Sequence, residues 1–222
     1  MSSGRATATP SSFLRTWSPE VAKALLGSAV MALGICLFVA VELGSDSIDV
    51  LLDGMSRTFG ITLGQAQLIF TVATTIVAFI VNRSRVGVLS VVGGIMTSQL
   101  IDLFNIWILP MDLAAQGLAL RVAALLAGQV CLSASYAMLQ AVRNGMNVTD
   151  AIAQKLGSVL PGGYAVWRTV IDAACLVGGM LIGGVFGVGT VLFVLVNGNL
   201  VKLFARLLAR VGFGAQPGAE RA

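Results

Sequence analysis

The chain alternates long apolar stretches with short polar links. Six stretches are long enough to cross a hydrocarbon core of about 30 Å, which takes roughly 20 helical residues. They comprise residues 21–41, 63–81, 86–109, 119–142, 164–182 and 185–203. Backbone groups in lipid must be hydrogen-bonded within the protein, and these runs lack the alternation of barrel strands. The pattern therefore predicts an all-α transmembrane bundle of six helices.

The two halves of the chain resemble each other at a nearly constant offset. A shift of 101 positions aligns Gly27 with Gly128 and Asp49 with Asp150, and a shift of 100 aligns Phe104 with Phe204. Such spacing indicates an internal repeat. Each unit holds three spans, and because three is odd, the second unit must enter the membrane upside down. We therefore expect two inverted three-helix repeats, at residues 20–110 and 111–208.

A polar link follows the first helix of each repeat. In the first link a Gly ends the incoming helix, Asp46 is placed to cap the next one, and Asp49 stands three residues further on. Asn147 and Asp150 hold the same positions in the second link. An acidic residue at this spacing resembles the reciprocal partner of a capping box. Each link is thus predicted to fold into a short amphipathic or re-entrant helix of about three turns, one at each face of the membrane.

Composition supports lipid as the surrounding solvent. Apolar residues make up 57% of the chain and charged residues only 11%, against about 25% charged residues in soluble domains. There is no His, which removes His-based catalysis, His-ligated metals and His pH sensing. The three Cys stand singly in apolar runs, so we expect no disulfide, no metal and no cofactor.

The basic residues set the expected orientation. If the N-terminus is cytoplasmic, twelve of the 14 Lys and Arg residues fall on the cytoplasmic side, and only Arg57 and Arg121 fall outside. Residues 1–19 lack the apolar core of a secretory signal and are expected to form a disordered cytoplasmic tail. Residues 209–222 are expected to form a second one. The chain is thus predicted to lie in a bacterial cell (inner) membrane with both termini in the cytoplasm.

Several segments carry a resemblance to a known family. They are Glu42-Leu-Gly-Ser-Asp-Ser-Ile-Asp-Val-Leu51, Gly145 to Asp150, Arg168-Thr-Val-Ile-Asp172 and Gly183-Gly-Val-Phe-Gly-Val-Gly-Thr190. Across residues 25–207 the chain resembles the YczE/YyaS/YitT family of bacterial integral membrane proteins, most closely its YczE-like branch. Family members usually have a Pro just ahead of the Asp in these links, where this chain has Ser47-Ile48 and Val148-Thr149. The resemblance implies a multi-pass membrane protein and transfers no catalytic or ligand residues.

The polar residues within or beside the spans are the candidates for a substrate or ion pathway. Asp49 and Asp150 are either coupled groups at symmetry-related gates or helix caps. Arg168 and Asp172 are four apart, so they are placed to form an ion pair. An ionisable group at the centre of a span costs about 2.5–3.5 kcal/mol, which makes Asp172 a candidate cavity residue. Arg168 has the alternative of reaching the cytoplasmic headgroups.

Two further candidates lie deeper in the apolar runs. Asp102 lies in the third span, and inversion places it at the opposite end from its repeat counterpart Lys202, so the two should not pair. Asn197, like Asn199, either lines a polar path or hydrogen-bonds between helices.

Glycines gather between the last two spans, at positions 178, 179, 183, 184, 187 and 189. They suit close helix packing, a broken helix lining a site or a tight turn, which we favour. Lys202, Arg206 and Arg210 then repeat every four residues, which suits the anionic lipids of the inner leaflet.

Two functions fit this pattern. Inverted repeats with short helices in matching positions and few buried charges are typical of secondary transporters, with a small-molecule site at the repeat interface. The alternative is a non-transporting membrane partner that stabilises or regulates another membrane or biosynthetic system. No enzyme is expected, because a nucleophile and base pair is lacking, and nucleic acid is not an expected partner. Substrate, coupling ion and oligomeric state stay open.

Overall fold

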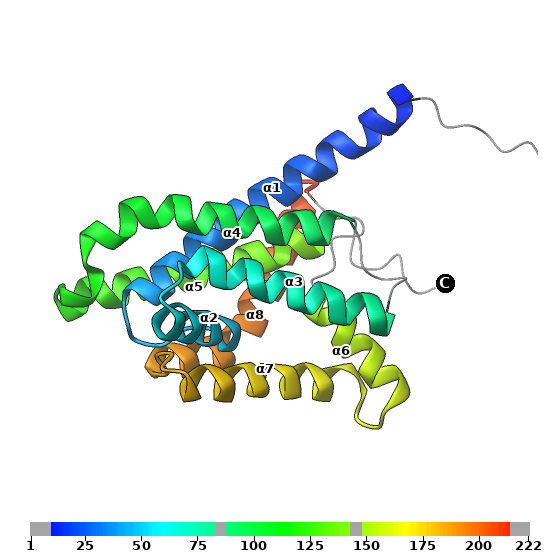
Figure 1. Cartoon of the computed structure of the whole chain (residues 1–222). Coiled ribbons are helices and arrows are strands. Elements are labelled where there is room, and N and C mark those ends of the chain that lie inside the picture. The colour runs from blue at the N-terminus through cyan, green and yellow to red at the C-terminus, as the bar shows by residue number, and fades with distance from the viewer. Residues whose placement is uncertain (1–9, 83–87, 143–147, 214–222) are drawn as a thin grey trace, which may run out of the picture.

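The structure is a computed structural model that describes residues 10–82, 88–142 and 148–213, and within these ranges it is entirely helical (Figure 1). There are six long helices and two short ones, and each short helix follows the first or the fourth of the long ones. The long helices are α1 (Pro10–Ala40), α3 (Leu63–Asn82), α4 (Val88–Ile108), α5 (Leu118–Gln140), α7 (Gly163–Leu181) and α8 (Val188–Arg210). The short ones are α2 (Ser47–Phe59) and α6 (Val148–Val159), and two 3-10 turns, Leu109–Met111 and Leu113–Ala115, join α4 to α5.

Six of these helices are long and apolar enough to cross a membrane, as predicted. Most ends lie within three residues of the predicted ones, and two differ more. α1 begins at Pro10, so part of the segment expected to be a disordered tail is helical. α8 runs from Val188 to Arg210 rather than over residues 185–203, because the glycine-rich segment delays its start and the row of basic residues continues the helix.

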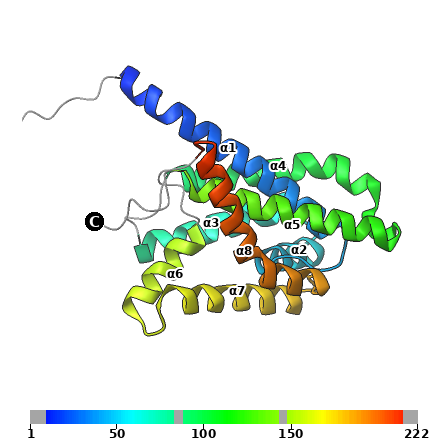
Figure 2. The same cartoon turned by 180° about the vertical axis from the view of Figure 1, so that it is seen from behind.

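α1 and α5 form the centre of the bundle and cross closely. A Cβ added at Gly34 would lie 2.8 Å from Leu132 Cγ, and one at Gly128 would lie 2.8 Å from Phe38 Cδ2. Small residues at such crossings let membrane helices approach without a cavity. α4 packs against α1, and α8 packs against α5 (Figures 1 and 2).

The short helices are present at both predicted positions, and they lie toward opposite ends of the bundle. α2 lies toward the end that holds the α4–α5 connection, whereas α6 lies toward the end where α1 begins (Figures 1 and 2). With 13 and 12 residues, each is about 20 Å long or less, too short to cross the hydrocarbon core. α2 packs against α7, and α6 packs against both α7 and α3.

The apolar side chains divide into a core and an exposed outer surface. Ile35, Phe38 and Leu132 are buried at the α1–α5 contact, where Phe38 meets Phe193 of α8 edge-to-face at 5.9 Å between ring centroids. In contrast, large apolar side chains on the long helices face outward, and Leu181 is 81% exposed. A soluble protein avoids extended apolar surface of this kind. The chain is therefore a multi-pass membrane protein whose outer side chains face lipid.

Candidate functional site

A cavity of about 90 Å³ lies inside the bundle, where the N-terminal ends of the two short helices meet the long ones. Ile48 and Asp49 of α2 and Val148 and Asp150 of α6 line it. The rest of its wall comes from α1, α3, α4 and α5. Its polar lining comprises Asp49, Gln67, Thr71, Thr74, Ser90, Thr97, Tyr136, Gln140 and Asp150.

Asp46, and not Asp49, makes the capping contacts at the start of α2. Asp46 Oδ1 accepts a hydrogen bond from the Ser47 backbone N–H at 2.6 Å, and its Oδ2 accepts one from the Tyr136 hydroxyl at 2.9 Å. The N-cap predicted at Asp46 is thus confirmed. Burial raises the pKa of Asp46, while the Arg168 guanidinium and these two hydrogen bonds oppose that shift.

Asp49 lies one helical turn beyond the cap and has no such contacts. It is only 3% exposed, and its Oδ2 has no hydrogen-bond partner within the described part of the chain. Burial raises the pKa of Asp49 well above its ordinary value, and the carboxylates of Asp46 and Asp53 raise it further. Asp49 therefore makes no capping contact with the described residues, and it is one of the residues that line the cavity.

Asp150, which aligns with Asp49 at the offset of 101 residues, is held by neighbours on α7. Its Oδ1 accepts a hydrogen bond from the Tyr164 hydroxyl at 3.0 Å and lies 3.5 Å from Arg168 Nη1. Arg168 Nη2 lies 3.2 Å from Asp172 Oδ1, so the predicted Arg168–Asp172 ion pair is present. The Arg168 guanidinium thus forms ion pairs with two carboxylates, Asp150 and Asp172. The second predicted cap, Asn147, lies outside the described residues.

Asp102 and Asn197 lie away from the cavity. Asp102 accepts hydrogen bonds from the Gly64 N–H at 3.0 Å and from the Thr62 hydroxyl at 2.9 Å, so it secures the first turn of α3 rather than contacting Lys202. Asn197 Oδ1 accepts a hydrogen bond from Ser133 of α5 at 2.9 Å. Asn197 was expected either to line a polar path or to hydrogen-bond between helices, and the structure shows the hydrogen bond between helices.

The glycine-rich segment between α7 and α8 forms a turn, as we favoured, and also a packing surface. Gly183 adopts φ +87°, which favours glycine. A Cβ at Gly179 would lie 2.6 Å from the backbone nitrogen of Leu51 in α2, and one at Gly184 would collide with the Val50 carbonyl. Glycine is thus required where α2 rests on the end of α7.

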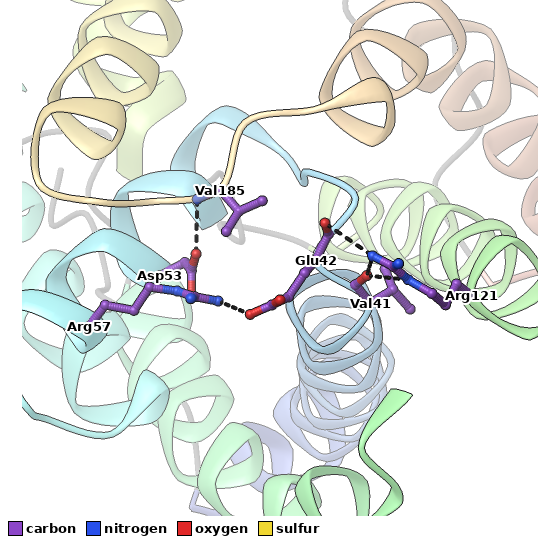
Figure 3. Close-up of polar contacts among 6 residues, drawn as sticks. All are labelled: Val41, Glu42, Asp53, Arg57, Arg121 and Val185. Atoms are coloured by element: carbon purple, nitrogen blue, oxygen red, sulfur yellow. Dashed lines mark hydrogen bonds and ion pairs between the residues drawn. The ribbon is translucent and has the colours of Figure 1, made fainter. Parts of the chain in front are cut away.

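A polar network at the α2 end of the bundle was not identified from sequence (Figure 3). Arg57 donates to Asp53 Oδ1 at 2.7 Å and to Glu42 Oε1 at 2.6 Å, and Asp53 Oδ2 accepts the Val185 N–H at 3.0 Å. Arg121 of α5 donates to the Val41 carbonyl at 2.7 Å. The hydrogen bonds to Glu42 and Asp53 raise the pKa of Arg57, so it stays charged.

This network joins the end of α1, α2, the α7–α8 turn and the start of α5. It borders a wider recess of about 720 Å³ that opens on the opposite side of the packed core from the cavity. In the sequence, this network is indicated by the i, i+4 spacing of Asp53 and Arg57. The contacts with Glu42 and Val185 depend on the tertiary fold.

Fold and site together define an α-helical multi-pass membrane protein with a partly polar internal cavity. The chain belongs to a family of unknown function, DUF6198, whose profile matches residues 20–206. It is similar to the uncharacterized protein YyaS of Bacillus subtilis (strain 168), with 24% identity over 185 residues that cover 83% of this chain and 92% of the relative. The expected resemblance to the YyaS-containing family is thereby confirmed. Comparison with solved structures gives no match.

Proposed function

We propose that this protein is a small-molecule permease whose substrate site is the cavity between the N-terminal ends of α2 and α6. One observation carries the proposal. Two helices too short to cross the membrane both begin at one internal cavity, and each brings a carboxylate there, Asp49 and Asp150. Transporters place substrate and ion sites where such interrupted helices meet, near the interface of two repeats.

The packing of the helices supports an inverted repeat. If α1 to α4 are matched with α5 to α8, the contact of α1 with α4 corresponds to that of α5 with α8. The contact of α2 with α7 corresponds to that of α6 with α3, and α2 lies on α3 as α6 lies on α7. The main departure from this symmetry is that α3 packs along α4, whereas the described parts of α7 and α8 do not pack extensively. A smaller one is that α1 contacts α2, whereas the described parts of α5 and α6 do so less. The proposed two-fold axis passes through the α1–α5 crossing.

The proposed orientation places both termini in the cytoplasm of a bacterial cell, as the positive-inside bias indicates. Lys23, near the start of the apolar span that α1 carries from Glu20 to Ala40, lies 5.7 Å from the ring centroid of Phe213, just beyond α8. The start of this span and the end of α8 therefore share one side of the bundle. The cavity lining extends toward that side, to Ala24 and Ser90. In this arrangement the cavity faces the cytoplasm, and the Asp53–Arg57–Glu42 network holds the opposite end closed. Lys202, Arg206 and Arg210 then lie near anionic lipids of the inner leaflet.

We assign no enzymatic reaction, cofactor or nucleic-acid partner to this cavity. The chain contains no His, and the cavity lining offers carboxylates, amides and hydroxyls without a recognisable pair of nucleophile and base. The alternative, a non-transporting membrane partner, is one outcome of the test.

The first test is a search for a ligand of the purified protein in detergent. A panel of metabolites, ions and lipids is added, and the apparent melting temperature is measured. A ligand at 100 times its dissociation constant stabilises a protein by about 2.7 kcal/mol. Uptake of each stabilising compound is then measured in proteoliposomes. A panel in which only lipids stabilise would favour the non-transporting partner.

A matched pair of variants on α3 links uptake to the cavity. Thr74 lines the cavity, and among the described residues its hydroxyl bonds to carbonyls of its own helix, so Thr74→Phe fills the space without leaving a described distant partner unpaired. Val77 is 45% exposed on the outer surface, so Val77→Phe is the control. We expect uptake to fall at least about tenfold in Thr74→Phe alone. Equal uptake by both variants would contradict a path through this cavity.

A further inference from the structure

The cavity wall carries negative charge that is only partly compensated. Its charged members are Asp49 and Asp150, and the lining contains no Lys or Arg among the described residues. Asp150 is already held by Tyr164 and Arg168. Asp49 is not held, because its buried Oδ2 has no hydrogen-bond partner in the described ranges. A charged carboxylate buried in this way requires a cation or a proton.

Three hydroxyl groups of the cavity wall present acceptors to a ligand. The Thr74 hydroxyl donates to the Phe70 carbonyl, and the Thr97 hydroxyl donates to the Gly93 carbonyl at 2.9 Å. The Tyr136 hydroxyl donates to Asp46. Because each of these hydroxyls has one proton and that proton is already used, a ligand meets their oxygen lone pairs. A ligand that contacts these three oxygens must supply the hydrogen-bond donors itself.

The Gln67 side chain uses one of its two amide protons on Thr71 Oγ1 at 3.2 Å, and its carbonyl oxygen is an acceptor. The remaining wall is apolar or aromatic and includes Met31, Ile35 and Phe70. Such a surface suits a short alkyl group, and an aromatic face also attracts a cation. A cavity of about 90 Å³ holds roughly four non-hydrogen atoms, on the scale of about 150 Å³ for benzene.

The geometry points to a binding site for a small primary ammonium ion, held by the Asp49 carboxylate with its alkyl group against the apolar wall. Binding exchanges one cation for one proton: R–NH₃⁺ enters, the Asp49 carboxyl group releases H⁺, and the ion pair R–NH₃⁺···⁻OOC remains. The binding step stands on the cavity alone. Its use in transport, as exchange of an amine for a proton, rests on the proposed function.

Asp49 is the group in the cavity best suited to hold that proton. Burial and two neighbouring carboxylates raise its pKa, so the empty cavity favours the protonated form. Titratable groups lie near Asp49 on several of the elements packed around it. Those that interact with Asp49 itself are the N-cap Asp46, Asp53 of α2, Cys36 of α1 and Tyr136 of α5. On α7, Arg168, Asp172 and Cys175 interact with its neighbour Asp46. α3 contributes the neutral Gln67 to the wall.

The experiment uses the full chain in detergent and ethylammonium chloride as the probe. Isothermal titration calorimetry in two buffers with different ionisation enthalpies gives both the dissociation constant and the number of protons released. We expect one proton per ethylammonium bound. In the range where Asp49 is protonated, we also expect affinity to weaken by about tenfold for each unit that the pH is lowered. Sodium chloride, propionate and acetamide, titrated separately, test an inorganic cation, an anion and a neutral donor.

Three variants make the result specific. Asp49→Asn keeps the shape and removes the charge, so binding should weaken by at least about 30-fold and the proton release should disappear. Asp49→Glu keeps a carboxylate and should retain both, which guards against a folding defect. Asp112 is an exposed carboxylate in the α4–α5 connection, with φ +42° that Asn tolerates, so Asp112→Asn should match the parent.

The outcomes of these experiments distinguish the ammonium-binding site from the proposed permease function. Absence of ethylammonium binding, binding without proton release, or unchanged binding by Asp49→Asn would each overturn the ammonium site. Binding of sodium ion in its place would overturn the organic cation. If ethylammonium binds as expected but is not taken up by proteoliposomes, the site stands and the permease fails. If a neutral or anionic compound is carried while ethylammonium does not bind, the permease stands and the site fails.

Discussion

Asp53 provides a direct test of the network that joins α2 to the α7–α8 turn. Its side chain is 7% exposed, and it accepts both the Val185 N–H at 3.0 Å and the Arg57 guanidinium at 2.7 Å (Figure 3). Asp53→Ala leaves the backbone N–H of Val185 without its acceptor, at a cost of about 1–3 kcal/mol. It also removes one of the two carboxylates that hold Arg57. We expect the free energy of unfolding to fall by about 2–3 kcal/mol.

The matched control is Glu42→Ala, which removes the other carboxylate bonded to Arg57. That pair is shorter, at 2.6 Å, but its side chains are 43% and 44% exposed, and pairs this exposed contribute about 0–1 kcal/mol. Melting temperatures in detergent should fall by about 4–12 °C for Asp53→Ala and by much less for Glu42→Ala. Equal losses would show that contact distance, rather than burial and the Val185 hydrogen bond, decides the stability of this network.

Three further predictions follow from the packing, the cap and the buried carboxyl group. Gly179→Ala should cost about 1–3 kcal/mol because its Cβ would meet the α2 backbone. Gly198→Ala, with open space around it, should gain up to about 1 kcal/mol in the same melting assay. Asp102→Ala should cost about 1 kcal/mol through the lost cap of α3 and leave ethylammonium binding unchanged in calorimetry. Above about pH 4 the unfolded Asp49 ionises while the folded one keeps its proton. The melting temperature of the empty protein should therefore decrease as the pH rises up to the raised folded pKa, with a smaller slope in Asp49→Asn.

The hydropathy pattern predicted the spans well because every membrane span has to meet the same physical requirement. A segment of about 20 apolar residues in hydrocarbon must be helical, whatever it packs against. Hydropathy does not show where a helix begins outside the lipid. α1 accordingly starts at Pro10, at a position that tolerates proline, and α8 continues to Arg210 through a row of basic residues.

The candidate site could be predicted only in part. The repeat offset brought Asp49 and Asp150 together as counterparts, and both line the cavity. Which of them has a partner depends on Arg168, which lies on a helix packed beside α6. Asp102 stood out because it is a charge in an apolar run, but its role as a cap depends on Gly64, 38 residues earlier. The sequence thus identified the polar residues that stand in apolar surroundings. The tertiary contacts show which of them stabilise the fold, as Asp102 does, and which have no such role, as Asp49.

The three carboxylates of α2 show why Asp49 stands apart. Asp46 satisfies the first turn of its helix and a buried tyrosine hydroxyl, and Asp53 satisfies a turn N–H and an arginine. Folding alone accounts for these two. Asp49 is as buried as they are, yet its Oδ2 has no partner in the described part of the chain, and its charge is opposed by both neighbours. Burying a neutral Asn or Ser at this position would cost less free energy than burying a carboxylate. Because local rules of stability fail mainly where a residue serves another purpose, the position of Asp49 argues for a ligand rather than for the fold.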